Sequence, residues 1–484
     1  MEKEKKSATV GGSLLVMGLI VAFMCGGMIL FKGKLQVLIF FSWLLVLPYA
    51  MYLGYTFKDL EEGAYDMMRK VLQPGVIILG VGAMIGTWIL SGTVPLLIYI
   101  GLDIITPKIF LLTTLLLCSI VSLCTGTSWG TIGTAGLAMV GIGAGLGIPA
   151  GMTAGAVICG AFFGDKMSPV SDSTNLAAAV TGTELMTHVK HMCYTTGPSY
   201  LICCVIFTVI GFKYGANDLD HESIATIMNG IAATFKLGFV PLLPAVLVIT
   251  LLLLKRPAVS SIMLGAVAGA LVAILYQDAS IATTLNAMNS GYSGKSGMEF
   301  LDKLLNRGGI ASMYGIMGLF IFALGLGGML QTCGILTAIL SIFANRIKSN
   351  RDLLFSAMIV SYISNCIGAT ISFASVMTGT LMAPMFRERG VKPENLSRII
   401  EDCGTLSGPV IPWNTGSVYA SGALGVSPFE FIPYCFLSFI NPVISIIYAI
   451  TGFSITTYSE GEMETTHNET ITVAEAIRIA EKEA

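Results

Sequence analysis

Residues 160–176 read GAFFGDKMSPVSDSTNL and interrupt an otherwise apolar stretch of the chain. Pro169 removes a backbone donor and breaks the helical hydrogen-bond ladder, and Gly164 permits unusual backbone dihedrals. From residue 109 to residue 164, immediately before the break, the sequence contains no Asp, Glu, Lys or Arg. Inside a hydrocarbon layer, the carboxylates, hydroxyls and amide around the break are costly unless they face a cavity or one another. The segment therefore predicts a broken transmembrane helix that carries a functional site.

The composition agrees with a membrane location. Of the 484 residues, 54% are hydrophobic and only 12% are charged, about half the charged share of a soluble domain. A soluble core this apolar would leave large hydrophobic patches exposed. The net charge of −2 provides no basic field for nucleic acid, and no P-loop supports ATP-driven transport. These observations exclude a disordered chain and a soluble enzyme and favour a polytopic membrane protein.

Apolar runs long enough to cross a bilayer as helices recur along the chain. The predicted spans cover residues 13–31, 35–55, 74–100, 109–146, 149–186, 195–213, 237–254, 257–276, 313–340, 354–386, 396–426 and 431–453. Residues 57–71 mix charged and apolar side chains, as an amphipathic helix at the membrane surface does. A long polar loop is expected to end at Gly309. The four histidines are expected in loops or at span ends, on the solvated surface.

The two halves of the chain resemble each other. GDKMSPV at 164–170 aligns with GTLSGPV at 404–410, an offset of 240 residues that places Pro412 opposite Asp172. Residues 88–92 and 125–128 align with segments 242 residues later. A near-constant offset indicates an internal repeat, and the alternative is shared bias in apolar, glycine-rich sequence. The predicted units are a first repeat (1–213), a linker (214–236), a second repeat (237–456) and an acidic cytoplasmic tail (457–484).

The distribution of Lys and Arg predicts how the repeats lie in the membrane, because basic loops stay in the cytoplasm. Basic loops at 346–351 and 387–398 flank residues 354–386, a run too short for two full crossings. This run and its counterpart 109–146 are therefore predicted to be re-entrant hairpins. The expected fold is an all-α polytopic membrane protein of two inverted repeats. Each repeat has five transmembrane helices, a hairpin and a broken helix, which is typical of secondary transporters, and both termini are cytoplasmic.

Asp172 is the predicted ion- and proton-exchanging carboxylate, because an acid at membrane depth can be neutralised by either a proton or a cation. The alternative for Asp172 is a helix N-cap. Asp165 is equally compatible with ion binding and with a structural salt bridge to the adjacent Lys166. The predicted Na⁺ ligands are the hard oxygen donors of the break, namely Asp165, Ser168, Ser171, Asp172, Ser173, Thr174 and Asn175.

The second half offers neutral donors at its own break, residues 401–415. The predicted substrate or second-half ligands are Thr405, Ser407, Asn414 and Thr415. Glu401 and Asp402 are expected at the cytoplasmic mouth near Arg398, in ion pairing or in proton transfer. The small polar residues at the hairpin tips are candidates to close the site, with helix packing as the alternative. These tip residues are Thr125, Thr127, Ser128, Asn365, Thr370 and Ser372.

Three segments resemble the NhaC-type sodium/proton antiporter family of the ion-transporter superfamily. They are GDKMSPVSDSTNL at 164–176, TGTSWGT at 125–131 and IPWNT at 411–415. The resemblance covers nearly the whole membrane region. It implies exchange of Na⁺ for H⁺ in a bacterial inner (plasma) membrane, and some members resemble carriers that exchange malate for lactate with Na⁺ and protons.

The predicted function is secondary active Na⁺/H⁺ antiport at a shared carboxylate near the membrane midplane. No enzyme activity and no cofactor are expected, and Na⁺ and H⁺ are the transported ions. The alternative is a Na⁺-linked carrier of an organic anion or amino acid, such as a malate/lactate antiporter. In that case the second-half motif and helix N-termini would hold the substrate carboxylate. The predicted partners are the lipid bilayer, Na⁺ and H⁺; a small carboxylate or amino acid and a second copy of the chain in a homodimer are left open.

Overall fold

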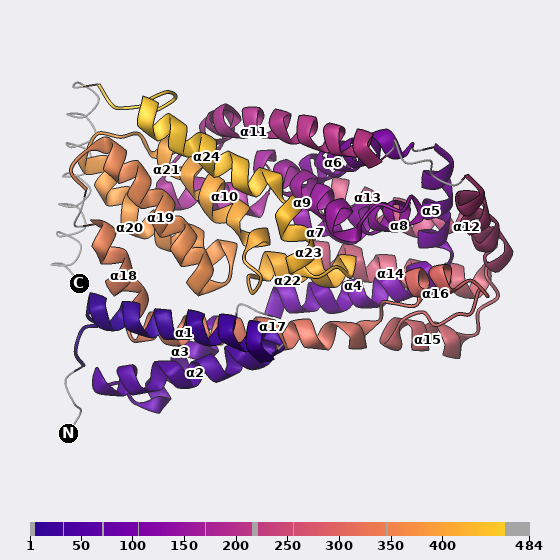
Figure 1. The fold of residues 1–484 in the computed structure, drawn as a ribbon, viewed down its shortest axis with the longest axis horizontal. Coiled ribbons are helices and arrows are strands. Elements are labelled where there is room, and N and C mark those ends of the chain that lie inside the picture. The colour runs from indigo at the N-terminus through magenta and orange to yellow at the C-terminus, as the bar shows by residue number, and fades with distance from the viewer. Residues whose placement is uncertain are drawn as a thin grey trace, which may run out of the picture.

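The computed structural model describes residues 5–31, 33–69, 72–104, 106–169, 171–214, 221–254, 256–344 and 347–459 (Figure 1). Within these ranges every named element is helical, and one isolated antiparallel bridge joins Val391 to Thr457. Five of the described helices are long and apolar enough to cross a membrane, or up to seven spans if each of two bent pairs counts as one. The prediction of an all-helical membrane protein is therefore confirmed. Nearly all of the predicted tail lies outside the described residues. Residues 215–220 of the predicted linker also lie outside them.

The first half contains eleven α-helices within the described residues. They are α1 (Val10–Phe31), α2 (Leu35–Tyr52), α3 (Phe57–Met68), α4 (Leu72–Leu90), α5 (Thr93–Ile104), α6 (Pro107–Thr125), α7 (Ser128–Thr131), α8 (Leu137–Gly145), α9 (Ala150–Met167), α10 (Asp172–Thr181) and α11 (Leu185–Tyr214). The predicted amphipathic segment is α3, which buries Leu60, Ala64 and Met67. A capping box of Thr56 and Asp59 begins α3. Hydrogen bonds from the Thr56 backbone and side chain, together with Lys5, lower the pKa of Asp59 to about 2.

The second half contains the remaining described helices. They are α12 (His221–Thr234), α13 (Leu243–Leu253), α14 (Ala258–Leu275), α15 (Ile281–Ser290), α16 (Glu299–Leu305), α17 (Tyr314–Thr332), α18 (Ile335–Ala344), α19 (Asn350–Gly368), α20 (Ile371–Glu388), α21 (Pro393–Ile399), α22 (Thr415–Leu424), α23 (Pro428–Phe431) and α24 (Phe436–Thr451). The expected polar loop before Gly309 was wrong, because α15 and α16 lie within it. Two predicted spans, residues 74–100 and 313–340, are each divided into two helices. Gly92 and Gly334 adopt positive φ angles of 79° and 73° and separate α4 from α5 and α17 from α18.

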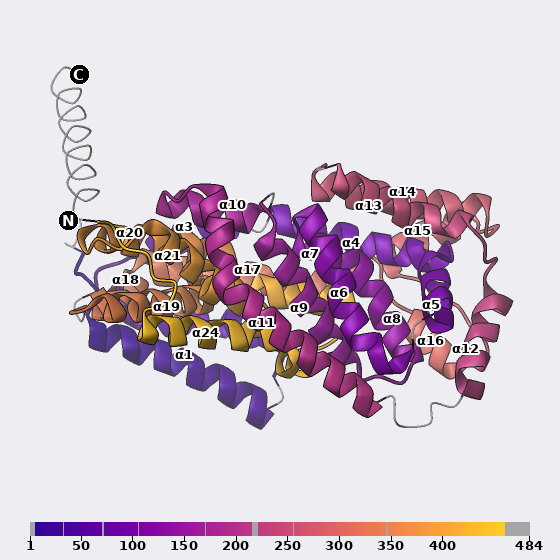
Figure 2. The ribbon, with the colours of Figure 1, turned by 90° about the horizontal axis from the view of Figure 1, so that it is seen from above.

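Both segments predicted to be re-entrant hairpins fold as helices joined by a tight turn, and the first arm, α6, is itself long and apolar enough to cross a membrane. α6 ends at Gly126 with a φ of 68°, and the Thr127 side chain then caps α7. α19 ends at Ala369 with a φ of 53°, and the Thr370 side chain caps α20. The returning arm of the first hairpin passes through a π-helical turn, Ile132–Gly136, before α8. Figures 1 and 2 place α19 and α20 toward the end of the long axis at which α1 begins, and α6 to α8 farther along that axis.

Helix ends recur between the halves at a constant spacing. Three capping positions are each repeated 243 residues later, namely Thr106 at Ser349, Ser171 at Asn414, and Gly182 at Gly425. This spacing differs from the 240 residues obtained by aligning the two breaks. It places Asp172 opposite Thr415 and not opposite Pro412. Helix caps therefore define the correspondence at the breaks better than the short sequence match does.

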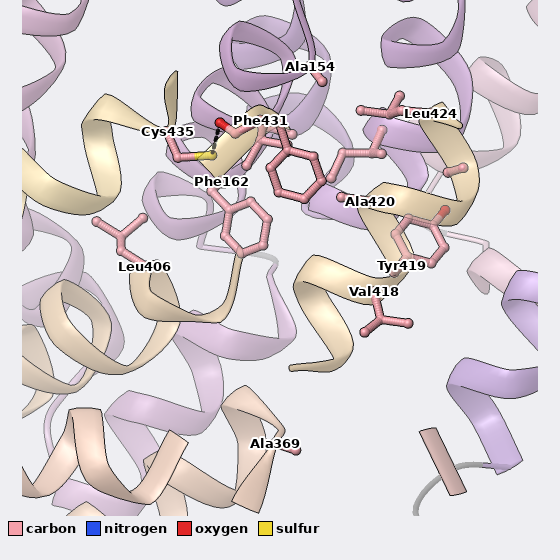
Figure 3. Close-up of a cluster of buried hydrophobic side chains, with 14 of the residues drawn as sticks. Ala154, Phe162, Ala369, Leu406, Val418, Tyr419, Ala420, Leu424, Phe431 and Cys435 are labelled. Atoms are coloured by element: carbon pink, nitrogen blue, oxygen red, sulfur yellow. Dashed lines mark hydrogen bonds between the residues drawn. The ribbon is translucent and has the colours of Figure 1, made fainter. Parts of the chain in front are cut away.

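The core joins the halves where α9 meets the second broken helix. Phe162 of α9 belongs to the same buried cluster as Tyr419 of α22 and Phe431 of α23 (Figure 3). In the first half, α9 packs closely on α6 through glycines: a Cβ at Gly160 would lie 2.4 Å from the carbonyl oxygen of Leu115. These contacts fix the end of α9, where the first break begins.

Replacing Gly164 by Val is expected to destabilise the protein by about 1–3 kcal/mol, the usual cost of overpacking a tight contact. A Cβ at this position would lie 2.5 Å from the Leu123 nitrogen and the Ser119 carbonyl oxygen, both in the α6 backbone. The matched control is Gly197→Val in α11, where nothing lies within 4 Å of the added Cβ. Thermal unfolding of the purified protein in detergent checks this. Equal midpoints for the two variants would contradict the close α6–α9 packing.

Candidate functional site

Side chains of the break itself hold the chain between α9 and α10. Ser171 is the N-cap of α10, and its hydroxyl accepts a hydrogen bond from the Ser173 nitrogen at 3.2 Å. The Asn175 amide donates to the carbonyl oxygens of Pro169 (3.0 Å) and Ser171 (2.7 Å). Ser168 is buried and donates to a backbone carbonyl of α6 at 2.9 Å. The predicted residues Ser168, Ser171 and Asn175 therefore fix the shape of the break.

Asp165 is the carboxylate on which the break and the first hairpin converge. It is only 9% exposed. Ser128 at the hairpin tip donates to its Oδ2 atom at 2.6 Å, and Ser171 donates to its Oδ1 atom. The Thr174 hydroxyl donates to the backbone carbonyls of Asp165 (3.3 Å) and Lys166 (2.9 Å). The result is a buried acid whose two carboxylate oxygens accept hydrogen bonds from hydroxyls of two separate segments, the hairpin tip and the break.

Asp172 lies close enough for its charge to act on Asp165, but its own side chain is exposed. Within the described ranges, no hydrogen bond holds the Asp172 carboxylate. The alternative role as a helix N-cap was wrong, because Ser171 caps α10. The assignment of ion exchange to Asp172 stays a prediction. The buried position with several oxygen neighbours belongs to Asp165.

Lys166 forms a buried ion pair with Asp402 of the π-helical segment Ile400–Gly404, and both side chains are 0% exposed. Lys166 therefore pairs with the second half of the chain and not with its neighbour Asp165. Asp402 is further stabilised by hydrogen bonds from Thr195 (3.0 Å), Asn441 (2.7 Å) and Ser445 (2.8 Å) and by Arg398 at 3.9 Å. A buried ion pair needs such additional donors to offset the loss of water.

Two histidines depart from their expected surface position. His188 and His191 of α11 are 0% and 5% exposed. The charges of Lys166 and Asp402 both act on His188, so this residue lies beside the buried ion pair. This burial could not be predicted from the apolar run at 195–213, because α11 begins earlier, at Leu185, and so includes both histidines.

The second-half donors bond chiefly to one another. The Asn365 amide at the second hairpin donates to the Gly404 carbonyl (2.7 Å) and to Ser407 Oγ (2.8 Å). The Asn414 amide donates to Asn365 Oδ1 at 2.7 Å, and its own oxygen accepts from the Gly416 nitrogen at 3.0 Å. Three predicted residues, Asn365, Ser407 and Asn414, are thus brought together as a neutral cluster at the start of α22.

The remaining hairpin residues have different surroundings. Thr127 and Thr370 are helix N-caps, which accounts for their hydroxyls locally. Thr125 is buried, and its hydroxyl has no hydrogen-bond partner in the described part of the chain. Ser372 is exposed. Of the predicted tip residues, Ser128 and Asn365 are therefore the two that contact a broken helix through their side chains.

Three further residues of the second break are Thr415, Thr405 and a second buried acid, Glu401. The Thr415 nitrogen donates to the Ala369 carbonyl at 2.8 Å, which ties α22 to the hairpin turn. Thr405 and Glu401 are both 0% exposed. The Thr405 hydroxyl and both carboxylate oxygens of Glu401 have no hydrogen-bond partner among the described residues. The expected position of Glu401 at a cytoplasmic mouth was wrong, because its side chain is enclosed.

The second half of the chain also holds the first hairpin tip. Tyr419 of α22 donates to the Trp129 carbonyl at 2.7 Å, and the two rings stack with centroids 4.3 Å apart. Within the second half, the Trp413 indole donates to the Cys366 carbonyl of the second hairpin at 2.7 Å. Each hairpin tip is thus anchored by an aromatic residue of the second broken helix.

Comparison with known proteins adds the family. A family model described as the Na⁺/H⁺ antiporter family matches residues 160–453, which include both breaks and the second hairpin. The chain belongs to the Na⁺/H⁺ antiporter family. This chain is 40% identical over 450 residues to the "Malate-2H(+)/Na(+)-lactate antiporter" of Bacillus subtilis (strain 168). The match covers 93% of this chain and 96% of that protein. The resemblance to the NhaC-type family is thereby placed among named relatives.

Two further relatives show the range of the family. The antiporter is 34% identical over 452 residues to the "Na(+)/H(+) antiporter NhaC" of Alkalihalophilus pseudofirmus, which covers 93% of this chain and 97% of that one. It is 31% identical over 454 residues to the "Arginine/ornithine antiporter ArcD" of Halobacterium salinarum, covering 93% and 94%. These comparisons confirm the NhaC-type resemblance. The relatives are antiporters, which confirms that the chain is a transporter and not an enzyme.

Proposed function

We propose that this chain exchanges Na⁺ for H⁺ by letting the two ions compete for Asp165. The observation that carries the proposal is a buried carboxylate whose two oxygens face the hydroxyls of Ser128 and Ser171. Carboxylate, hydroxyl and carbonyl oxygens are the ligands that hard cations prefer. The same carboxylate can instead bind a proton, and occupancy by one ion excludes the other. Mutually exclusive occupancy is sufficient for coupled exchange.

In this proposal Asp172 acts at the approach to the site. It lies in the first turn of α10 and is exposed, so it can attract cations from water without losing its hydration. Ser173, Thr174, Asn175 and Ser168 shape the break around Asp165. This arrangement retains both acids of the predicted site but assigns them different tasks.

We also propose that the halves are inverted repeats of five spans, each with a re-entrant hairpin, in a bacterial inner membrane with both termini in the cytoplasm. Three observations support this topology. Helix caps of the first half recur 243 residues later, the two hairpins lie apart along the long axis, and basic residues flank α19 and α20. Alternating access by two inverted repeats would then expose Asp165 to one side at a time.

A second candidate function is Na⁺-linked exchange of an organic anion or amino acid. The relatives from Bacillus subtilis and Halobacterium salinarum favour it, because their names include malate, lactate, arginine and ornithine. The neutral cluster of Asn365, Ser407 and Asn414 lies at the N-terminus of α22. Helix N-terminal amides and such neutral donors suit a substrate carboxylate.

Proteoliposomes that enclose a pH-sensitive dye distinguish the two functions. We expect a Na⁺ gradient to move protons when no organic solute is present. Proton movement that occurs only after addition of malate, lactate, arginine or ornithine would support the second candidate instead. Empty liposomes and liposomes in K⁺ medium are the controls for leakage and for ion selectivity.

Replacing Ser128 by Ala is expected to raise the half-saturating Na⁺ concentration about tenfold, because a hydrogen bond to a charged group contributes about 1.5–3 kcal/mol. The matched control is Ser372→Ala in the second hairpin, where the side chain is exposed and should not matter. The dye assay over a range of Na⁺ concentrations measures both. An equal effect of the two variants would remove the first hairpin tip from the site.

A further inference from the structure

Glu401 is a buried acid that the exchange at Asp165 leaves without a role. It lies in the π-helical segment Ile400–Gly404 and is 0% exposed. Neither carboxylate oxygen has a hydrogen-bond partner in the described part of the chain. The Thr405 hydroxyl lies close enough to influence Glu401. Among the described residues, however, it forms no hydrogen bond of normal geometry. A buried polar group left unpaired in this way requires an explanation.

The charges around Glu401 come from two segments. Lys166 and Asp165 act on it from α9, and Asp402 acts on it from its own segment. Lys166 is already paired with Asp402, so Glu401 has no cation of its own. The helices packed against residues 400–404 carry further charged and polar groups. These are Arg398 on α21, Asn441 and Ser445 on α24, Tyr362, Arg351 and Asp352 on α19, Arg387 and Glu388 on α20, and Asp172 on α10.

An ionised carboxylate with neither donors nor a counter-ion is very costly in such a site. In this conformation Glu401 therefore holds a proton. When it releases that proton, Lys166 is the cation that can compensate the new charge, since it already acts on Glu401. Lys166 directly follows Asp165 in α9, so the two acids are linked through one segment of backbone.

We propose that Glu401 is a second proton-carrying residue, so that two protons are exchanged for each Na⁺. This inference rests on the proposed exchange at Asp165. One proton binds an oxygen of Asp165, and one binds an oxygen of Glu401. Both protons are released on the opposite side of the membrane, and Na⁺ then binds there. The charge count takes the buried cations Lys166 and Arg398 together with the carboxylates of Asp165, Glu401 and Asp402. Na⁺ at Asp165 with Glu401 ionised leaves this cluster neutral, and two protons leave it with one positive charge.

The two-proton exchange moves one net charge per cycle, so a membrane potential must affect it. In wild-type proteoliposomes at zero potential, a tenfold proton gradient should be balanced by an about 100-fold Na⁺ gradient. In Glu401→Gln the balance should fall to about tenfold, and a valinomycin-imposed K⁺ potential should no longer change the rate. The matched control, Glu430→Gln, replaces an exposed glutamate and should keep the wild-type balance.

A second measurement does not depend on the variant folding. The infrared difference spectrum of wild-type protein between its Na⁺-loaded and protonated forms should show two protonated carboxyl bands. A single band, a wild-type balance of one proton per Na⁺, or a two-proton balance retained in Glu401→Gln would overturn the role of Glu401 and leave exchange at Asp165 intact. Absence of any Na⁺-evoked proton movement in the wild type would instead overturn the proposed function.

Discussion

Asp165→Asn should reduce Na⁺-driven proton movement to the level of empty liposomes. The amide has nearly the volume of the carboxylate, and its oxygen can still accept hydrogen bonds from Ser128 and Ser171, so the break should keep its shape. It can neither take up a proton nor neutralise Na⁺. Both halves of the exchange are lost at once, which is why this is the largest functional effect that we expect. The dye assay in proteoliposomes measures it.

Asp172→Asn is the matched control, because it makes the same chemical change at an exposed carboxylate that no hydrogen bond holds within the described residues. We expect exchange to continue with a higher half-saturating Na⁺ concentration, since only an attracting charge is removed. The reverse pattern, in which Asp172→Asn is inactive and Asp165→Asn exchanges normally, would return the exchanging role to Asp172.

Breaking the buried ion pair should have the largest effect on stability. Lys166→Met leaves Asp402 buried without its principal cation, and such an uncompensated charge costs about 3–5 kcal/mol. Asp402→Asn strands Lys166 in the same way. The yield of monodisperse protein and its thermal unfolding midpoint in detergent should both fall for either single variant.

The double variant Lys166→Met/Asp402→Asn tests the cause of that loss. It removes both charges, and Arg398 keeps its hydrogen bonds to the Ser454 carbonyl (3.1 Å) and hydroxyl (2.8 Å). We therefore expect the double variant to unfold at a higher temperature than either single variant. If the losses of the two single variants simply add in the double variant, Lys166 and Asp402 are not coupled.

Much of the site could be predicted where local chemistry decides the structure. Pro169 and the cluster of polar residues marked the first break, and the small polar residues Thr127 and Thr370 marked the hairpin turns. The short amphipathic helices α12, α15 and α16 could not be found by looking for apolar runs, because they are too polar and too short to span a bilayer.

Contacts between distant segments could not be predicted from local pattern. Lys166 stands next to Asp165 in the sequence, yet its partner is Asp402 on the other repeat. Which carboxylate a lysine reaches depends on how α9 packs against residues 400–404, and no single-sequence signal specifies that. The same packing encloses Glu401, whose charged neighbours in the sequence indicated a more exposed position.

The most direct test of competition at Asp165 is Na⁺ binding to the purified protein, measured by calorimetry at a series of pH values. If a proton and Na⁺ exclude each other, the apparent Kd should rise by about tenfold or more for each unit that the pH falls through the acidic end of the series. Asp165→Asn should show no binding heat at any pH. A Na⁺ affinity that is independent of pH, or one that survives in Asp165→Asn, would contradict the account.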